Sequence, residues 1–327
     1  MSSLRSQAWS LFDRIVATAP LRDANPWHRE DDGGVRFEPD YDTLRLLLGV
    51  PAHLQATSQS GVPALALDVW VSYELRRAGF DPDAIWPRPV APRVLPQEIV
   101  KFVAGLPAKQ RADLEARINL RGAGGSTSAN ILGKNYVKQV DVVMSAWATG
   151  PELMISTKRM DSSFGKNAAN RVEESYGDAK NLRLRHPQAA LGFFYGLGAN
   201  ALETEPETAR WLIDLLGKLG READAYDAVG LVIIDAATAF VDPTSEEDPA
   251  GPLEPGVPEP AGDDADVDFG IDPADLRRLP PVALNRGEVP AELDPGRFLG
   301  RMCALVLDRT PINFHREARA RRHAAAT

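Results

Sequence analysis

The chain is poor in cysteine and has no long hydrophobic run. Cys303 is its single cysteine, so no disulfide can form within the chain and no cysteine cluster can hold a structural zinc ion. The five histidines show no metal-ligand spacing. No apolar stretch reaches the roughly 18 residues that a transmembrane helix needs, and the first residues lack the apolar core of a signal peptide. We therefore expect a cytoplasmic protein with no membrane partner.

The formal net charge of −9 is concentrated in one segment. Residues 241–270 contain ten Asp and Glu, six Pro and no Lys or Arg, so adding those ten charges back to −9 leaves +1 for the rest of the chain. A segment this acidic buries too little apolar surface to order itself, and we expect a disordered linker. The remaining chain has an ordinary globular composition and is long enough for one large domain or two modest ones.

The first third of the chain is mainly helical by pattern. A stretch with five prolines in seventeen residues, 80–96, is incompatible with a helix or a central strand and predicts a boundary or an extended connector. We expect residues 1–95 to form a mainly helical region that serves DNA recognition or dimerisation. Hydrophobic spacing predicts helices at Leu4–Thr18, 41–49, 61–79, 96–104 and 109–120.

The middle of the chain, residues 96–240, predicts an α/β core. Apolar runs at 140–144 and 153–155 predict two strands, which an amphipathic helix, a third apolar run, a helix at 207–220 and a strand at 228–234 follow. This order is typical of a mixed sheet flanked by helices. Residues 271–327 predict a C-terminal segment with a helix at 295–308 and a basic tail.

Polar residues occur where two of these strands and the next helix meet. Asp141 lies on the first strand, Lys158 ends the second, and Glu173 and Glu174 lie on the helix. Mg²⁺ takes six oxygen ligands and usually receives only one or two carboxylates from a protein, with phosphate and water supplying the rest. A lysine beside the ion can orient or help deprotonate the attacking water.

At these residues the chain resembles the PD-(D/E)xK nuclease superfamily, and within it the type II restriction endonucleases. That pattern needs an acid on one strand, met by Asp141, and an acid, any residue and a lysine on the next. Ser156 stands in place of the second acid, before Thr157 and Lys158. Some restriction enzymes of this superfamily also read S-x-K and take the missing carboxylate from the following helix. The resemblance covers roughly residues 105–240.

The resemblance implies a restriction-endonuclease-like fold and a Mg²⁺-dependent endodeoxyribonuclease that cuts double-stranded DNA as a homodimer. In this interpretation Asp141, a glutamate of the helix and the Thr157 carbonyl bind Mg²⁺, Lys158 positions the water, and Ser156 holds that water or the lysine. At about 100° per residue, Glu174 shares the polar face of the helix, so we favour it over Glu173, which a small rotation of the helix would exchange with it.

The region around this site is basic. Seven basic and four acidic residues between 154 and 186 give a local charge of +3, as contact with phosphate requires. The predicted DNA-binding residues are Lys134, Lys138, Arg159, Lys166, Asn167, Asn170, Arg171, Lys180, Arg183 and Arg185.

Three other interpretations remain. The chain could instead be a non-cleaving DNA-binding or regulatory protein on the same fold, in which Ser156 indicates that the site has lost its catalytic activity. A serine hydrolase would use Ser163 and Lys166, which form an S-x-x-K pattern. The Gly- and Ser-rich stretch 121–135 resembles a phosphate loop but lacks the G-K-S/T ending, so we expect a flexible loop there instead.

Overall fold

The computed structural model describes residues 3–57, 60–118, 129–162, 164–236 and 276–326. Ser163, the side chains of Lys166 and Asn167, and the acidic segment 241–270 lie outside the described residues. No helix in the described part of the chain combines the length and hydrophobicity needed to cross a bilayer.

The described part of the chain contains both helices and strands. The helices are α1 (Leu4–Thr18), α2 (Tyr41–His53), α3 (Val62–Arg77), α4 (Gln97–Ala104), α5 (Ala108–Ile118), α6 (Phe164–Arg185), α7 (Asn200–Thr204), α8 (Pro206–Leu219), α10 (Pro295–Arg309) and α11 (Arg316–Ala326), with 3₁₀ turns η2 (Arg286–Glu288) and η3 (Ala291–Leu293). The strands are β1 (Trp27–Arg29), β2 (Val35–Phe37), β3 (Ile85–Trp86), β4 (Ala129–Leu132), β5 (Val137–Val140), β6 (Val142–Ala146), β7 (Gly150–Met160), β8 (Ala190–Gly198), β9 (Ala228–Ala236) and β10 (Val282–Leu284).

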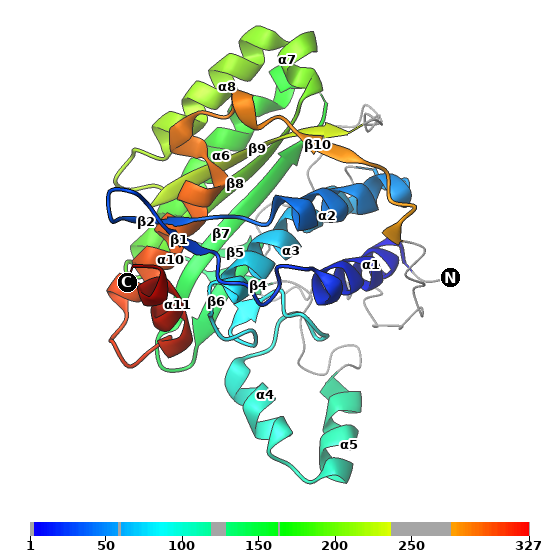
Figure 1. Cartoon of the computed structure of the whole chain (residues 1–327), viewed down its shortest axis with the longest axis vertical. Coiled ribbons are helices and arrows are strands. Elements are labelled where there is room, and N and C mark those ends of the chain that lie inside the picture. The colour runs from blue at the N-terminus through cyan, green and yellow to red at the C-terminus, as the bar shows by residue number, and fades with distance from the viewer. Residues whose placement is uncertain (1–2, 58–59, 119–128, 163, 237–275, 327) are drawn as a thin grey trace.

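One mixed sheet organises the molecule (Figure 1). Within the described residues its strand order is β10-β9-β8-β7-β6-β3, with β7, β8 and β9 parallel and the outer pairs antiparallel. The α/β class and the mixed sheet flanked by helices are thus confirmed. Because β3 comes from region 1–95, β6 to β9 from region 96–240 and β10 from region 271–327, these three of the four predicted regions contribute to one sheet.

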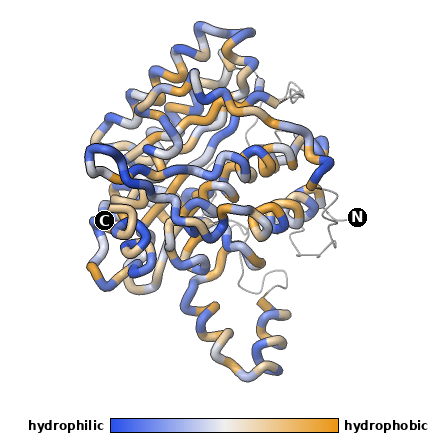
Figure 2. The backbone as a smooth tube through the Cα atoms, in the orientation of Figure 1, coloured by the Kyte–Doolittle hydropathy of each residue, from blue (hydrophilic) through white to orange (hydrophobic). Residues whose placement is uncertain are grey.

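Helices cover both faces of this sheet. Ile155 and Phe194 share a core with α1, α2, α3 and α10, whereas their neighbours Met154 and Phe193 share a second core with α6 and α8. Successive side chains of a strand point to opposite faces, so each central strand must be apolar on both sides. In Figure 2 the central strands are accordingly coloured mainly as hydrophobic.

Helix α3 lies inside the larger core. It contacts β7 on one side and α1, α2 and α10 on others, and almost all its residues are buried. A helix that is surrounded by the core is expected to carry apolar side chains on all its faces, and most side chains of α3 are apolar. Gly79 (φ +94°) follows it in the left-handed conformation, and a side chain at Gly79 would meet the backbone nitrogen of Ala318 in α11 at 2.9 Å. The predicted stop of α3 at this glycine is confirmed.

A buried ion pair crosses the turns of α3. Arg77 Nη1 lies 2.6 Å from Glu74 Oε2, and both side chains are at most 3% exposed. Glu74 Oε1 also accepts a hydrogen bond of 2.7 Å from the N–H of Asp40. Burial raises the pKa of Glu74 to about 7, although Arg77 and the Asp40 N–H lower it in part.

The raised pKa of Glu74 makes stability depend on pH. The folded chain binds this proton more tightly than the unfolded chain, so the free energy of unfolding should fall as pH rises from about 4.5 to about 7. Glu74→Gln removes the titration. We expect the free energy of unfolding of the wild type to fall by about 2–3 kcal/mol relative to that of Glu74→Gln across that range, as measured by urea unfolding. Asp42→Asn, at a side chain 89% exposed, is the control and should keep the wild-type profile. Parallel profiles of wild type and Glu74→Gln would contradict this prediction.

Two segments differ from their sequence-based predictions. The loop expected at 121–135 is wrong for Ala129–Leu132, which forms β4 against β5 because Ala129 is buried and packs in the smaller core; residues 119–128 lie outside the described residues. The basic tail forms helix α11. Its arginines bind main-chain carbonyls: Arg319 donates to Phe314 O at 2.9 Å, and Arg321 donates to Arg77 O at 2.7 Å.

Candidate active site

Asp141 lies at the bend between β5 and β6. Val142 pairs with Ile155 in the antiparallel register of β6 and β7, which brings the preceding Asp141 beside the middle of β7. The Thr157 N–H donates a hydrogen bond of 2.8 Å to Asp141 Oδ2. The acid of one strand and the S-x-K sequence of the next therefore meet, as the sequence predicts.

A second carboxylate reaches the same place from α3. The Thr157 hydroxyl donates a hydrogen bond to Asp68 Oδ1, and both residues are buried. Asp68 is not among the site residues expected from the sequence, because the apolar spacing of 61–79 predicts a helix but assigns no role to this acid. The available signal was the acid within the apolar run ALALDVWV, because burying a charged side chain in an apolar helix is costly without a partner.

Asp68 and Asp141 are both costly to ionise. Burial raises the pKa of Asp68 well above its ordinary value, and the charge of Asp141 raises it further. Burial likewise raises the pKa of Asp141, while Lys158 and the Thr157 N–H act against this. Two buried carboxylates this close are stable as anions only when a cation offsets them.

Lys158 points to the other side of the sheet from Thr157. Alternation along β7 directs Thr157 toward α3 and Lys158 toward α6. Burial lowers the pKa of Lys158, and the charge of Asp141 raises it. A lowered pKa increases the fraction of neutral amine, which is the form that accepts a proton from water.

The glutamates of α6 lie farther out. Glu173 and Glu174 are both exposed, and Glu174 Oε2 lies 3.7 Å from Arg171 Nη1. Burial lowers the pKa of Lys158 and the charge of Glu174 acts against this, but no hydrogen bond joins Glu174 to Asp141 among the described side chains. Ser156 is buried on this side, next to the Tyr226 hydroxyl, where its hydrogen bond lowers a tyrosine pKa that burial raises.

The β4–β5 hairpin that leads to Asp141 is fixed to α6. Asp178 of α6 accepts a hydrogen bond of 2.9 Å from the Tyr136 hydroxyl, and its Oδ2 lies 2.6 Å from Lys138 Nζ. Asn181 accepts a hydrogen bond of 2.8 Å from the Asn135 N–H. These contacts hold β5, the strand that ends just before Asp141, against α6.

The predicted DNA-binding residues divide into two groups. Lys134, Asn170, Lys180 and Arg185 are exposed, and Arg171 is partly exposed. Others are engaged inside the fold: Lys138 pairs with Asp178, Arg183 pairs with Asp227 at 2.8 Å, and Arg159 pairs with Asp161 at 2.8 Å with its side chain only 1% exposed. For Arg159 and Arg183 the structure therefore gives a role in packing, whereas the exposed group and Arg171 lie at the surface. The side chains of Lys166 and Asn167 lie outside the described residues.

A small cavity opens beside the two carboxylates. It has about 30 Å³ of space, and its walls include Asp68, Asp141, Arg5, Trp9 and Gln139. A space this size holds a water molecule or a small ion. The Trp9 ring nitrogen is buried and has no hydrogen-bond partner in the described residues, which leaves one donor for an oxygen in or near the cavity.

The carboxylates fit a magnesium ion better than a zinc ion. Within the described residues, no group of three His, Cys, Asp or Glu side chains is placed to hold a metal. Two carboxylates and a main-chain carbonyl, completed by water, match the way Mg²⁺ is usually bound, whereas zinc prefers His and Cys.

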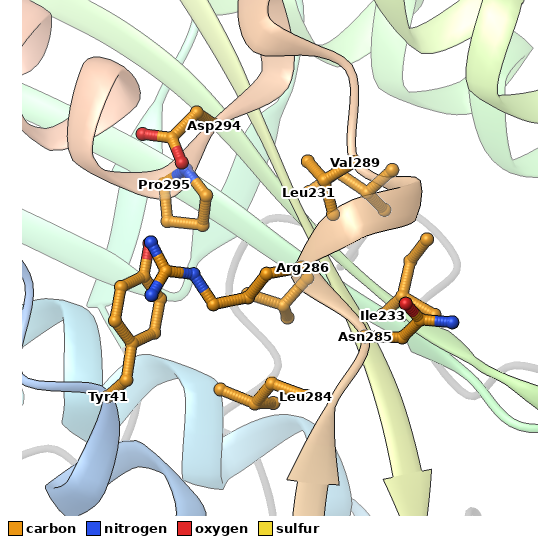
Figure 3. A pocket seen from close by; sticks show the side chains of 10 residues that line it. Tyr41, Leu231, Ile233, Leu284, Asn285, Arg286, Val289, Asp294 and Pro295 are labelled. Atoms are coloured by element: carbon orange, nitrogen blue, oxygen red, sulfur yellow. The ribbon is translucent and has the colours of Figure 1, made fainter.

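A second cavity lies between α2, β9 and β10 (Figure 3). The Arg286 guanidinium stacks 4.2 Å from the Tyr41 ring centre and covers it. The cavity has about 10 Å³ of space, which is less than a water molecule comfortably needs. It is a gap in the packing. The cavity beside Asp68 and Asp141 is therefore the better candidate site.

Comparison of the chain with protein-family models, with curated proteins and with solved structures gave no match. The function must therefore be argued from the site itself.

Proposed function

We propose that this protein is a Mg²⁺-dependent endodeoxyribonuclease of restriction type that hydrolyses phosphodiester bonds in double-stranded DNA. The observation that carries the proposal is the position of Asp141 beside Thr157, with Asp68 on the α3 side of the strand and Lys158 on the α6 side, where the charge of Asp141 acts on it. In this proposal Asp68 supplies the second carboxylate, which the motif usually has at the position of Ser156. The site therefore keeps two acidic side chains. The proposed fold is the restriction-endonuclease-like form of the mixed sheet described above.

Each residue has a distinct part in this proposal. Asp141 and Asp68 hold the ion with the Thr157 carbonyl, and Thr157 aligns both carboxylates through its N–H and hydroxyl. Lys158 orients the attacking water and accepts its proton. Ser156 holds that water or the lysine. When bound, Mg²⁺ would offset the charge that develops on the phosphate and lower the pKa of a bound water.

Double-stranded DNA is the proposed substrate because α6, on the Lys158 side of the sheet, and the turn between β4 and β5 carry exposed basic groups. Lys134, Asn170, Arg171, Lys180 and Arg185 supply contacts to the DNA backbone, which position a duplex without reading its sequence. Cutting both strands takes two copies of the site, so we propose a homodimer.

Plasmid cleavage tests the proposal. We expect the full chain to convert supercoiled mixed-sequence plasmid into nicked and linear forms with Mg²⁺, and to leave it intact with EDTA. Cleavage that persists in EDTA, or no cleavage across a wide range of Mg²⁺ concentrations and sequences, would contradict the nuclease proposal.

A second candidate function is a non-cleaving DNA-binding protein on the same fold. Ser156 favours it, because the position that usually carries an acid bears a hydroxyl. Retarded migration of duplex DNA in a gel without any cleavage, in the presence of Mg²⁺, would support this function in place of the first.

A further inference from the structure

The ring N–H of Trp9 is a buried donor at the wall of the acidic cavity, the space beside Asp68 and Asp141. Trp9 lies on α1 with its side chain 3% exposed, and within the described part of the chain its Nε1 has no hydrogen-bond partner. Trp86, on the wall of the same cavity, donates its ring N–H to Leu95 O at 3.0 Å. Because a buried donor without an acceptor is costly, we expect an oxygen from outside the chain to accept from Trp9.

The position of the Trp9 ring is fixed by its neighbours. The Arg93 guanidinium stacks over the ring, 4.0 Å from its centre, and Phe12 meets the ring edge-on with 6.1 Å between ring centres. Arg93 is itself buried, and its Nη2 lies 2.7 Å from Asp13 Oδ2, one turn along α1 from Trp9. A ring held in this way keeps its N–H in one direction, as a preorganised donor requires.

The size and charge of the acidic cavity limit what can occupy it. Its space of about 30 Å³ is roughly twice what one water molecule needs. The carboxylates of Asp68 and Asp141 attract a cation, whereas the positive end of the Trp9 N–H bond repels one and favours an oxygen lone pair. The cavity is therefore suited to a cation near the carboxylates and a water molecule near Trp9.

We propose that Trp9 is a positioning residue of the metal site: its ring N–H holds a water molecule of the hydration shell of the cation that Asp68 and Asp141 bind. The choice of Mg²⁺ as this cation rests on the proposed function, and Mg²⁺ keeps several waters when a protein binds it. A hydrogen bond that retains one of these waters raises the affinity of the site for the ion. Helix α1 thereby becomes part of the site.

Titration of the metal-free full chain with Mg²⁺, in the absence of DNA, tests this role. Trp9→Phe keeps an aromatic ring under Arg93 but removes the donor. We expect this variant to raise the Mg²⁺ dissociation constant about three- to tenfold in isothermal titration calorimetry, which is the effect of losing one hydrogen bond.

Trp27→Phe is the matched control. Trp27 is also buried, its Nε1 also lacks a partner among the described residues, and Phe37 meets its ring edge-on. Trp27 does not line the acidic cavity. Because the two variants lose the same group from similar packing, both should lower the thermal midpoint without metal by a similar amount. Only Trp9→Phe should weaken Mg²⁺ binding.

The wild-type chain supplies a second measurement that needs no substitution at Trp9. In an NMR spectrum of the indole N–H groups, assigned from the backbone, we expect Mg²⁺ to shift the Trp9 signal more than the Trp27 signal. Asp141→Asn, which removes a proposed ligand of the ion, should abolish this shift.

Equal Mg²⁺ affinities of the wild type and Trp9→Phe would overturn the inference, and so would a Trp9 signal that stays in place while calorimetry shows binding. A wild-type chain that binds no Mg²⁺ at millimolar concentrations would overturn both this inference and the proposed function. Neither titration measures cleavage. Binding that depends on Trp9 in a chain that never cuts DNA therefore contradicts only the proposed function, and a chain that cuts DNA but has unchanged Mg²⁺ affinity in Trp9→Phe contradicts only this inference.

Discussion

Asp141→Asn and Lys158→Met are each expected to lower the rate of single-turnover DNA cleavage by about a thousandfold or more, which corresponds to about 4 kcal/mol of transition-state stabilisation. Asp141→Asn removes a negative ligand and leaves the hydrogen bond from the Thr157 N–H in place. Lys158→Met keeps the length and apolar stem of the side chain but removes the proton acceptor. Both changes affect the chemical step, so DNA affinity measured with Ca²⁺ in place of Mg²⁺ should change only a few-fold.

The controls for this prediction are Asp214→Asn and Lys218→Met on α8. These two residues form an exposed pair, with side chains 54% and 61% exposed, so they repeat the same chemical changes away from the site. Both should cut at the wild-type rate. A Lys158→Met variant as active as Lys218→Met would remove the lysine from the mechanism, and the proposed function would lose its main support.

Local patterns in the sequence predicted the main elements well. Helix α1 has the predicted bounds, Leu4–Thr18, because its apolar positions repeat at helical spacing and Ser3 caps its first turn. The meeting of Asp141 with the strand that carries Lys158 also followed from the sequence, since a short turn joins antiparallel neighbours. Helix α11 was missed because it has little apolar surface; contacts of its arginines with main-chain carbonyls hold it in place.

Local sequence patterns could not identify Asp68 as the second carboxylate of the site. Asp68 and Thr157 are separated by 89 positions, and their contact depends on how α3 packs across β7. Spacing within one segment cannot reveal such a contact. From the sequence, the missing acid was therefore assigned to the helix after Lys158, with Glu174 favoured over Glu173, as in the motif that the chain resembles.

The choice of carboxylate yields the sharpest test of the site. Asp68→Asn is expected to lower cleavage by about a thousandfold, because the ion would lose one of its two negative ligands. Glu174→Gln is expected to lower cleavage less than tenfold, since this side chain is exposed and pairs with Arg171. Glu173→Gln should be milder still. The sequence alone favoured the opposite order, with Glu174 as the metal ligand.

Metal binding distinguishes loss of a ligand from damage to the fold. Asp68→Asn keeps an oxygen that can accept the Thr157 hydrogen bond, so its thermal midpoint without metal should lie near that of the wild type. An ion that binds the folded chain raises the thermal midpoint by mass action. We expect Mg²⁺ to raise it for the wild type and for Glu174→Gln, and to have little effect on Asp68→Asn. If Mg²⁺ instead stabilises Asp68→Asn and fails to stabilise Glu174→Gln, the ligand lies on α6, and Asp68 serves only to hold Thr157 in the core.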